Sequence, residues 1–257
     1  MRDPKHILIT GASSGLGAEL ARTYAAPGVT LALTGRDAAR LEAVAEQCRA
    51  NGASVEAAVL DVTDAAALKG WMLARDDVLP IELAIANAGI SAGTGGDTEP
   101  VEQVRRIFAV NVDGVMNTVL PLIPRMQARR RGQIALMASM AGFRGFPGAP
   151  AYCGSKAAVK IYGEGLRGML AGSGVEVSVI CPGYVRTPMT DRNGFPMPFL
   201  MEAGKAARII RDGLTRNKAR IAFPLPILAA VWLLQALPPG LIDPLMRRLP
   251  SKSIDAG

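Results

Sequence analysis

Cysteine and histidine are scarce in this chain of 257 residues. The three cysteines, Cys48, Cys153 and Cys181, are far apart and form no CxxC pair, and His6 is the single histidine. An odd number of scattered thiols argues against a disulfide framework, and so few soft ligands argue against a zinc site. We therefore expect no metal, and we interpret Cys153 as a packing residue and His6 as a strand-entry residue.

Aromatic residues make up only 5% of the chain, although its formal net charge is +7. A nucleic-acid-binding protein concentrates its bases among aromatics on one element. The one dense basic cluster here, residues 129–131, follows a long helical pattern, where cations favour a helix C-terminus. We expect no nucleic-acid partner. The opening residues also lack the apolar run of a secretory signal, so we expect a cytoplasmic protein.

Short β-like runs alternate with longer amphipathic stretches along most of the chain. This alternation is typical of a parallel sheet covered by helices, and the length suits one domain. It predicts an α/β protein with a Rossmann-type doubly wound fold, a seven-stranded parallel sheet with helices on both faces. Strands are expected at residues 6–10, 29–34, 55–60, 81–86, 133–139, 175–181 and 220–223. Helices are expected at residues 15–26, 38–51, 65–73, 100–130, 151–173 and 202–217.

A glycine-rich turn follows the first predicted strand and opens the first predicted helix. It reads Thr10-Gly11-Ala12-Ser13-Ser14-Gly15-Leu16-Gly17. Backbone N–H groups at a helix N-terminus bind anions, and glycines let a pyrophosphate approach the backbone closely. We assign cofactor binding to Gly11, Ser13, Ser14, Gly15, Leu16 and Gly17, with a plain structural turn as the alternative.

The second predicted strand ends without the carboxylate that would bind a ribose diol. The sequence there is Thr34-Gly35-Arg36-Asp37, in which a guanidinium is available for a 2′-phosphate. This favours NADP(H) over NAD(H). Asp37 leaves NAD(H) open, because it could turn toward the ribose as well as cap the next helix.

Two further strands end in small or polar residues at the same predicted edge. They are Asp61-Val62 after the third strand and Asn87-Ala88-Gly89 after the fourth. Small residues there let a flat ring and a ribose lie against the backbone, so these five residues are assigned to cofactor binding. The alternative is that Asp61 and Asn87 only shape turns.

Tyr152 and Lys156 are four residues apart in a predicted helix, so both side chains can reach one bound molecule. Such a pair is more often an exposed helix face, but this one follows Ser139 at the carboxyl end of a strand. A cation near a phenol lowers its pKa from about 10, as general acid–base catalysis requires. We expect Lys156 to have this effect on Tyr152.

Together these motifs resemble the short-chain dehydrogenase/reductase family, in its order, over roughly residues 5–220. The matching pieces include the glycine turn, Asn87-Ala88-Gly89, Asn111, Ser139, Tyr152-x-x-x-Lys156 and Pro182-Gly183-Tyr184-Val185-x-Thr187. The resemblance implies a catalytic tetrad of Asn111, Ser139, Tyr152 and Lys156.

In the roles that the resemblance implies, Tyr152 is the general acid and base, and Ser139 hydrogen-bonds the substrate oxygen. Lys156 binds the nicotinamide ribose and lowers the tyrosine pKa, while Asn111 positions a water. Pro182, Gly183, Val185 and Thr187 flank the nicotinamide. The resemblance also implies a homodimer or homotetramer.

Two apolar segments lie outside these motifs. Residues 184–202, rich in Met and Phe, predict a substrate lid within a catalytic domain of residues 1–223, and a lid facing the tetrad would favour an apolar substrate over a polyol. The alternative is that the lid residues only cap the core.

Residues 224–257 form an apolar C-terminal extension whose uncharged run is too short to span a bilayer. Nearby bases, at residues 216, 218 and 220 and then 247, 248 and 252, suit peripheral contact of residues 224–250 with the inner face of a membrane. A subunit interface or a cover over the pocket is the other interpretation.

The leading hypothesis is an NADP(H)-dependent carbonyl reductase that interconverts a ketone and a secondary alcohol, with a lipophilic substrate. An NAD-dependent alcohol dehydrogenase of the same family is the first alternative. A non-catalytic nucleotide-sensing regulator is the second, although such a protein should show a damaged tetrad.

Overall fold

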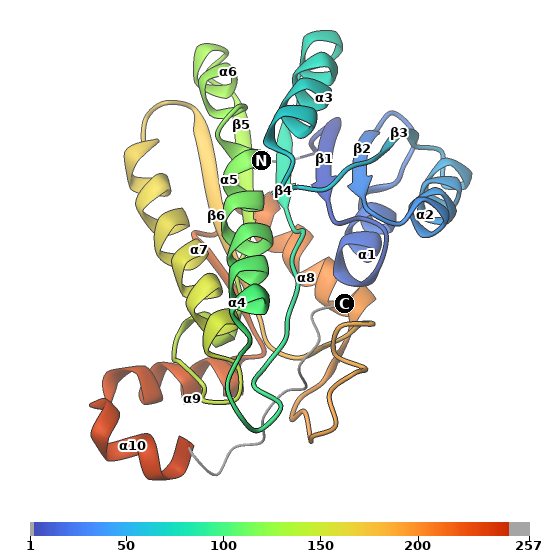
Figure 1. Ribbon diagram of the computed structural model, residues 1–257. Coiled ribbons are helices and arrows are strands. Elements are labelled where there is room, and N and C mark those ends of the chain that lie inside the picture. Colours follow the sequence, from blue (N-terminus) through green and yellow to red (C-terminus); the bar gives the residue numbers. More distant parts are fainter. Residues whose placement is uncertain (1–2, 247–257) are drawn as a thin grey trace.

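The computed structural model describes residues 3–246, and within them the chain forms a seven-stranded parallel sheet (Figure 1). The strand order is β3-β2-β1-β4-β5-β6-β9. The strands are β1 (His6–Thr10), β2 (Thr30–Gly35), β3 (Ser54–Val59), β4 (Leu83–Ala86), β5 (Gly132–Met137), β6 (Val175–Pro182) and β9 (Arg220–Phe223). The predicted doubly wound fold is confirmed. The order reverses between β1 and β4, where ligands bind in folds of this kind.

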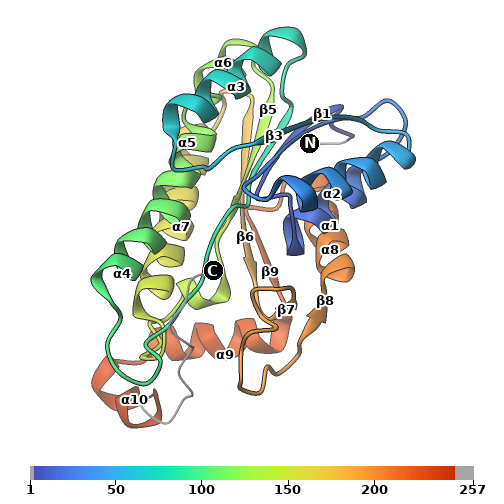
Figure 2. The same ribbon diagram turned by 45° about the vertical axis from the view of Figure 1, so that its right-hand side comes forward.

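Helices cover both faces of this sheet (Figures 1 and 2). One face carries α1 (Gly15–Tyr24), α2 (Ala38–Ala50) and α8 (Ala203–Thr215). The other carries α3 (Ala65–Val78), α4 (Val101–Phe108), α5 (Gly114–Val119), α6 (Ile123–Ala128) and α7 (Pro150–Met169). Right-handed crossovers bring every strand's carboxyl end to one edge.

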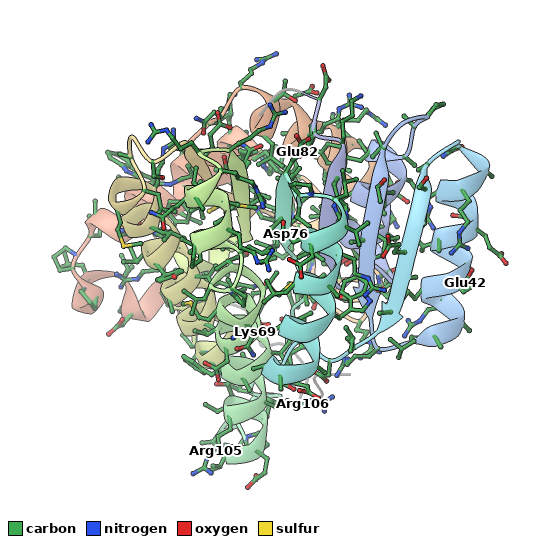
Figure 3. All side chains as sticks on the ribbon, turned by 90° about the horizontal axis from the view of Figure 1, so that it is seen from above. Glu42, Lys69, Asp76, Glu82, Arg105 and Arg106 are labelled. Carbon is green, nitrogen blue, oxygen red and sulfur yellow. The ribbon has the colours of Figure 1, made fainter. Side chains whose placement is uncertain are left out.

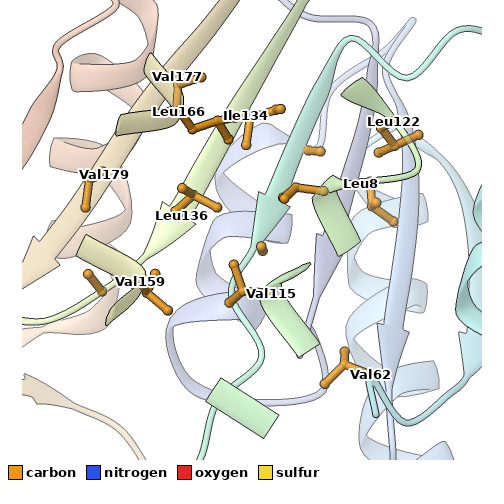
Figure 4. Close-up of a cluster of buried hydrophobic side chains, with 14 of the residues drawn as sticks. Leu8, Val62, Val115, Leu122, Ile134, Leu136, Val159, Leu166, Val177 and Val179 are labelled. Carbon is orange, nitrogen blue, oxygen red and sulfur yellow. The ribbon is translucent and has the colours of Figure 1, made fainter. Parts of the chain in front are cut away.

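An apolar cluster lies on each side of the sheet. Leu8, Leu136 and Val177 point to the side of α5 and α7, as Figure 4 shows, while Ile7 and Ile9 point to the side of α1 and α8. Successive strand residues face opposite sides, so a sheet buried on both faces needs strands that are apolar throughout. This explains the nearly continuous apolar runs in the sequence. Charged side chains such as Glu42 and Arg105 are exposed on the outer helices (Figure 3).

The helix predicted over residues 100–130 is present as one helical run over residues 101–128, but it is not a regular α-helix throughout. After α4 comes a π-helical turn, η1 (Ala109–Asp113), then α5, a turn, and α6, which has Pro124 in its first turn. A π-helical turn accommodates an extra residue in a helix, and a proline cannot continue one. In the described part of the chain, only the run 101–128 is long and apolar enough to cross a membrane by length and composition, and half of its most apolar window is buried.

The three arginines that follow α6 all bond to other groups of the protein. Arg129 donates to Asp76 at 2.9 Å, and Arg131 pairs with Glu82 at 2.8 Å. Arg130 donates to the Gly172 carbonyl at 3.0 Å. Asp76 and Glu82 lie at the amino edge of the sheet (Figure 3), opposite the ligand edge. These arginines therefore stabilise the fold at that edge.

The two apolar segments have defined structure. Residues 184–202 form a loop closed at its base by β7 (Val185–Arg186) pairing with β8 (Met201–Glu202). The extension contains α9 (Leu225–Ala236) and α10 (Pro239–Met246), separated at the two prolines. The three distal bases expected to contact lipid, Arg247, Arg248 and Lys252, lie outside the described residues.

Candidate active site

A cavity of about 620 Å³ lies at the carboxyl edge of the sheet. It brings together all the predicted site residues except Asn111, which is fully buried beside it. These lining residues are Gly11, Ser13, Ser14, Gly15, Leu16, Gly17, Arg36, Asp61, Val62, Asn87, Ala88, Gly89, Ser139, Tyr152, Lys156, Pro182, Gly183, Val185 and Thr187. Elements far apart in the sequence thus build one elongated site.

The glycine turn forms the floor of one end of this cavity. Gly11 has φ +67°, and a Cβ there would lie 2.7 Å from the Cα of Ala88. A Cβ on Gly17 would collide with the carbonyl oxygen of Gly11. Ser14 is the N-cap of α1, and its side chain makes no capping hydrogen bond. The glycines therefore let the turn pack tightly against the end of β4 and against itself, and the turn lines the cavity at a helix N-terminus that favours anions.

Asn87 and Asp61 have shaping contacts as well as places in the cavity wall. The Asn87 amide donates to the carbonyls of Thr10 at 3.0 Å and Gly11 at 3.2 Å, which ties β4 to the glycine turn. Asp61 accepts from the backbone N–H of Thr63 at 2.9 Å and from its hydroxyl at 2.8 Å. Both side chains therefore hold the backbone that any cofactor would contact.

The end of β2 places two guanidinium groups at the cavity. Arg36 is half exposed and lies 4.0 Å from the Asp61 carboxylate, and Arg40 also lines the cavity. Asp37 caps α2, because its two oxygens accept from the Arg40 backbone N–H at 2.9 Å and from Arg40 Nε at 2.8 Å. Those bonds lower the pKa of Asp37. The carboxylate is thus engaged by its own helix, and Arg40 is a site residue that the sequence analysis missed.

Tyr152 lies in the first turn of α7, which begins with a proline, and faces Ser139 just beyond the end of β5. The Ser139 Oγ accepts from the Ala141 N–H at 3.1 Å, which fixes the hydroxyl at the start of η2 (Met140–Gly142). Burial raises the pKa of Tyr152 to about 12, and its hydrogen bond with Ser139 acts in the opposite direction. Tyr152 therefore carries its proton at neutral pH.

Lys156 lies behind the tyrosine, with its Nζ donating to the Met137 carbonyl at 2.9 Å. The Nζ is 6.0 Å from the centre of the Tyr152 ring. Burial lowers the pKa of Lys156 to about 8. The pKa of Tyr152 is raised, not lowered as expected, because burial of the phenol outweighs the opposing effect of its hydrogen bond with Ser139. A Cβ on Gly89 would lie 3.2 Å from this Nζ, so the small residue leaves room for the ammonium group.

Asn111 lies in η1 and connects two parts of the site. Its Oδ1 accepts from the Ile90 N–H at 2.8 Å, and its Nδ2 donates to the Ile90 carbonyl at 3.0 Å and to Ser155 Oγ at 3.0 Å. Ser155 in turn donates to the Tyr152 carbonyl at 2.8 Å. The asparagine thus ties the end of β4 to the catalytic helix. Ser155 was not recognised from the sequence, although it directly precedes Lys156.

One other contact holds the first turn of α7. The Glu99 carboxylate accepts from the Ala151 N–H at 2.9 Å, as an anion at a helix N-terminus should. Cys153, in the same turn, is a buried free cysteine. Within residues 3–246 no group of three or more His, Cys, Asp or Glu side chains is placed to hold a metal ion.

The predicted lid contributes less to the cavity than expected. Only its first part, as far as Thr190, lines the wall, because the Thr190 hydroxyl donates to the Val185 carbonyl at 2.6 Å and closes a turn. Phe195 packs edge-on against Tyr184, with ring centroids 6.2 Å apart, and Phe199 is exposed. The Met and Phe side chains of residues 195–201 therefore do not form the cavity wall. Its apolar members include Ile90, Val110, Met137 and Met189, which the sequence analysis did not single out.

Comparison with known proteins agrees with this geometry. The short chain dehydrogenase family model matches residues 5–195. An uncharacterized oxidoreductase of Myxococcus xanthus is 40% identical over 243 residues, which cover 94% of this chain and 96% of the relative.

Two solved structures resemble the whole chain. A short-chain dehydrogenase from Sphingobium yanoikuyae in complex with NADPH has a TM-score of 0.80 and 31% identity, covering 95% of this chain and 96% of that one. A short chain dehydrogenase/reductase from Burkholderia phymatum in complex with NAD has a TM-score of 0.83 and 27% identity, covering 98% of each chain. The cavity, the glycine turn and these relatives support a nicotinamide cofactor. The chain belongs to the short-chain dehydrogenase/reductase family and is an oxidoreductase.

Proposed function

We propose that this enzyme interconverts a ketone and a secondary alcohol with NADP(H), and that its substrate is lipophilic. The observation that supports this most strongly is the placement of Ser139, Tyr152 and Lys156 in one cavity with the glycine turn. When bound, the nicotinamide supplies or accepts the hydride. The chain's own groups bind and orient the substrate and the cofactor, and they move the proton.

In reduction, the Tyr152 hydroxyl donates its proton to the substrate oxygen. Burial raises the pKa of this hydroxyl to about 12, so the proton is present at neutral pH. The Ser139 hydroxyl, held by the Ala141 N–H, hydrogen-bonds the same oxygen and stabilises its developing negative charge. In oxidation the deprotonated Tyr152 oxygen takes the proton of the alcohol, and the Ser139 hydroxyl hydrogen-bonds the same substrate oxygen.

Lys156 and Asn111 have supporting roles in this proposal. The Lys156 ammonium, oriented by the Met137 carbonyl, would donate to the ribose hydroxyls of the cofactor. Asn111 holds the strand end and the catalytic helix in register through Ile90 and Ser155, and its π-helical turn is the place where a water would be positioned.

The choice of NADP(H) rests on the charges at the end of β2. Arg36, Asp37 and Arg40 all line the cavity there. A 2′-phosphate would meet the two guanidinium groups, while the Asp37 oxygens accept from Arg40. NAD(H) stays the alternative, since a solved relative from Burkholderia phymatum holds NAD. A lipophilic substrate is supported by Met189 of the loop 184–202, whose side chain in the cavity wall offers a polyol no hydrogen bond.

A substrate panel with both cofactors tests this proposal. Purified enzyme would be assayed with NADPH and with NADH against short polar, long-chain and polycyclic ketones. We expect NADPH oxidation, fastest with the apolar ketones. Turnover of sugars alone would contradict the lipophilic substrate, and tighter binding of NADH than NADPH would contradict the cofactor assignment.

A further inference from the structure

The C-terminal extension exposes an unusually apolar surface, which we call the α9–α10 face. Residues 221–242 contain no charged side chain, and in the twelve-residue helix α9 only Val231 is buried. Four large side chains of this face are more than half exposed: Leu225 at 72%, Trp232 at 63%, Leu233 at 58% and Leu241 at 73%. Several large apolar side chains exposed on two successive helices indicate a binding surface.

The extension is nevertheless firmly attached on its other side. Val231, Ile242 and Met246 are buried, and Arg144 donates to the Leu237 carbonyl at 3.3 Å. A Cβ on Gly183 would lie 3.4 Å from Ile227 Cδ1, so α9 begins beside a wall of the active-site cavity. In Figures 1 and 2, α9 lies across the ligand edge of the molecule. The exposed face is thus a fixed part of this edge.

We propose that the α9–α10 face docks on the surface of an anionic lipid bilayer. Helix α9 is apolar on all sides and too short to span a bilayer, and its tryptophan suits the boundary between acyl chains and head groups. The sequence continues directly from α10 into Arg247-Arg248 and then Lys252, bases that attract acidic head groups. The chain's net charge of +7 acts in the same direction. Arg216 and Lys218 precede β9, whereas α9 follows it. The two bases therefore lie at the other end of this strand from α9 and do not contribute to its surface.

Other occupants of this face fit less well. The eleven residues after α10 include only two large apolar side chains, Leu249 and Ile254, too few to cover the exposed leucines and the tryptophan. A second copy would also cover the exposed apolar side chains, but two chains that each carry a net charge of +7 repel each other, which opposes such pairing. A bilayer satisfies both the apolar face and the adjoining bases. This inference goes beyond the proposed function and does not depend on it.

Vesicle binding of the full-length chain tests the inference. We expect co-sedimentation with vesicles of phosphatidylcholine and phosphatidylglycerol, about tenfold or more tighter than with phosphatidylcholine alone. Trp232→Glu and Leu241→Glu should each weaken binding by about tenfold or more, since a charge opposes insertion of an apolar face. Val78→Glu is the matched control, because Val78 is 84% exposed on α3 and lies outside this face. It should bind as the wild type does.

The fluorescence of Trp232 gives a second test, in which the α9–α10 face keeps its own residues. The chain has two tryptophans, so Trp71→Phe leaves Trp232 as the sole indole. Its fluorescence should shift to the blue with anionic vesicles and become protected from an aqueous quencher. An unchanged spectrum, or equal vesicle affinity of Trp232→Glu and wild type, overturns the proposal. If Trp232→Glu instead halves the solution mass and leaves vesicle binding intact, the face pairs two copies and the proposal is also wrong.

Discussion

The two ends of the active-site cavity are held in different ways. At the cofactor end, the polar side chains are fixed by short bonds to the backbone, as Asn87 is to the glycine turn and Asp37 is to α2. At the substrate end, the loop 184–202 is closed by one short strand pair, and Phe199 and the α9–α10 face are exposed. The first end can receive a constant cofactor, and the second is free to differ between relatives.

This difference separates two kinds of effect. Changes at the cofactor end should alter cofactor affinity, while changes to the groups that meet the substrate oxygen should alter turnover alone. Cofactor affinity and turnover can both be measured on the same purified variant. Each variant therefore shows whether its substitution affects one of the two quantities or both.

The largest of the four graded effects is expected at Ser139. Ser139→Ala removes the hydroxyl that would stabilise the developing charge, and kcat should fall about 10²- to 10³-fold with an unchanged cofactor Kd. Ser178→Ala is a matched control, because its buried hydroxyl on β6 has no hydrogen-bond partner in the structure. If Ser139→Ala also lost cofactor affinity, changes at the two ends would not have separate effects, and the comparison would be wrong.

The next effect concerns the phosphate contacts. Arg36→Ala and Arg40→Ala should each weaken NADPH binding about 10- to 100-fold and leave NADH binding unchanged, since a charged hydrogen bond is worth about 1.5–3 kcal/mol. Arg49→Ala on the same helix pairs with Glu42 outside the cavity and should change neither affinity. Calorimetric titration with both cofactors measures these ratios. Equal losses for the two cofactors would show that these arginines do not recognise the 2′-phosphate.

A pH dependence of the cofactor end follows from Lys156. Burial lowers the pKa of its ammonium to about 8, so the charged form predominates below that pH and is lost as the pH rises through it. Cofactor Kd should therefore be constant below about pH 7.5 and rise above about pH 8, by up to tenfold per pH unit. Fluorescence titration from pH 6 to 10 would follow it. A Kd that stays constant across this range would contradict the assigned role.

The smallest effect is expected at Asp37, whose carboxylate caps α2. Asp37→Ala should lower the denaturant concentration at the unfolding midpoint slightly, because the cap of α2 is lost. The ratio of NADPH to NADH affinity should stay close to that of the wild type. Denaturant unfolding and cofactor titration give the two numbers. A marked shift of the ratio toward either cofactor would show that Asp37 acts on the ribose as well.

Much of this site could be predicted from the sequence because its signals are local. The glycine turn, Arg36 and the Tyr152–Lys156 pair lie next to strand and helix patterns that set their positions, and the structure brings them into one cavity. The contacts of Asn111 were not predictable in the same way. Its side chain bonds to Ile90 and Ser155, which come from other parts of the chain.

Two errors also have a long-range origin. The sequence placed a cation near Tyr152 and so favoured a lowered pKa, but the folded surroundings bury the phenol and raise the pKa. The apolar residues 195–201 were expected to face the tetrad, yet the turn closed by Thr190 diverts them and Phe195 packs on Tyr184. Both outcomes depend on burial and loop geometry, which spacing along the chain does not encode.

The central claim is that Tyr152 moves the proton while other residues hold the cofactor, and Tyr152→Phe tests it most directly. The substitution keeps the ring and removes one oxygen. With a ketone that the wild type accepts, kcat should fall about 10²- to 10⁴-fold while the NADPH Kd on the same protein stays unchanged. A variant that retains most of its turnover would contradict the account.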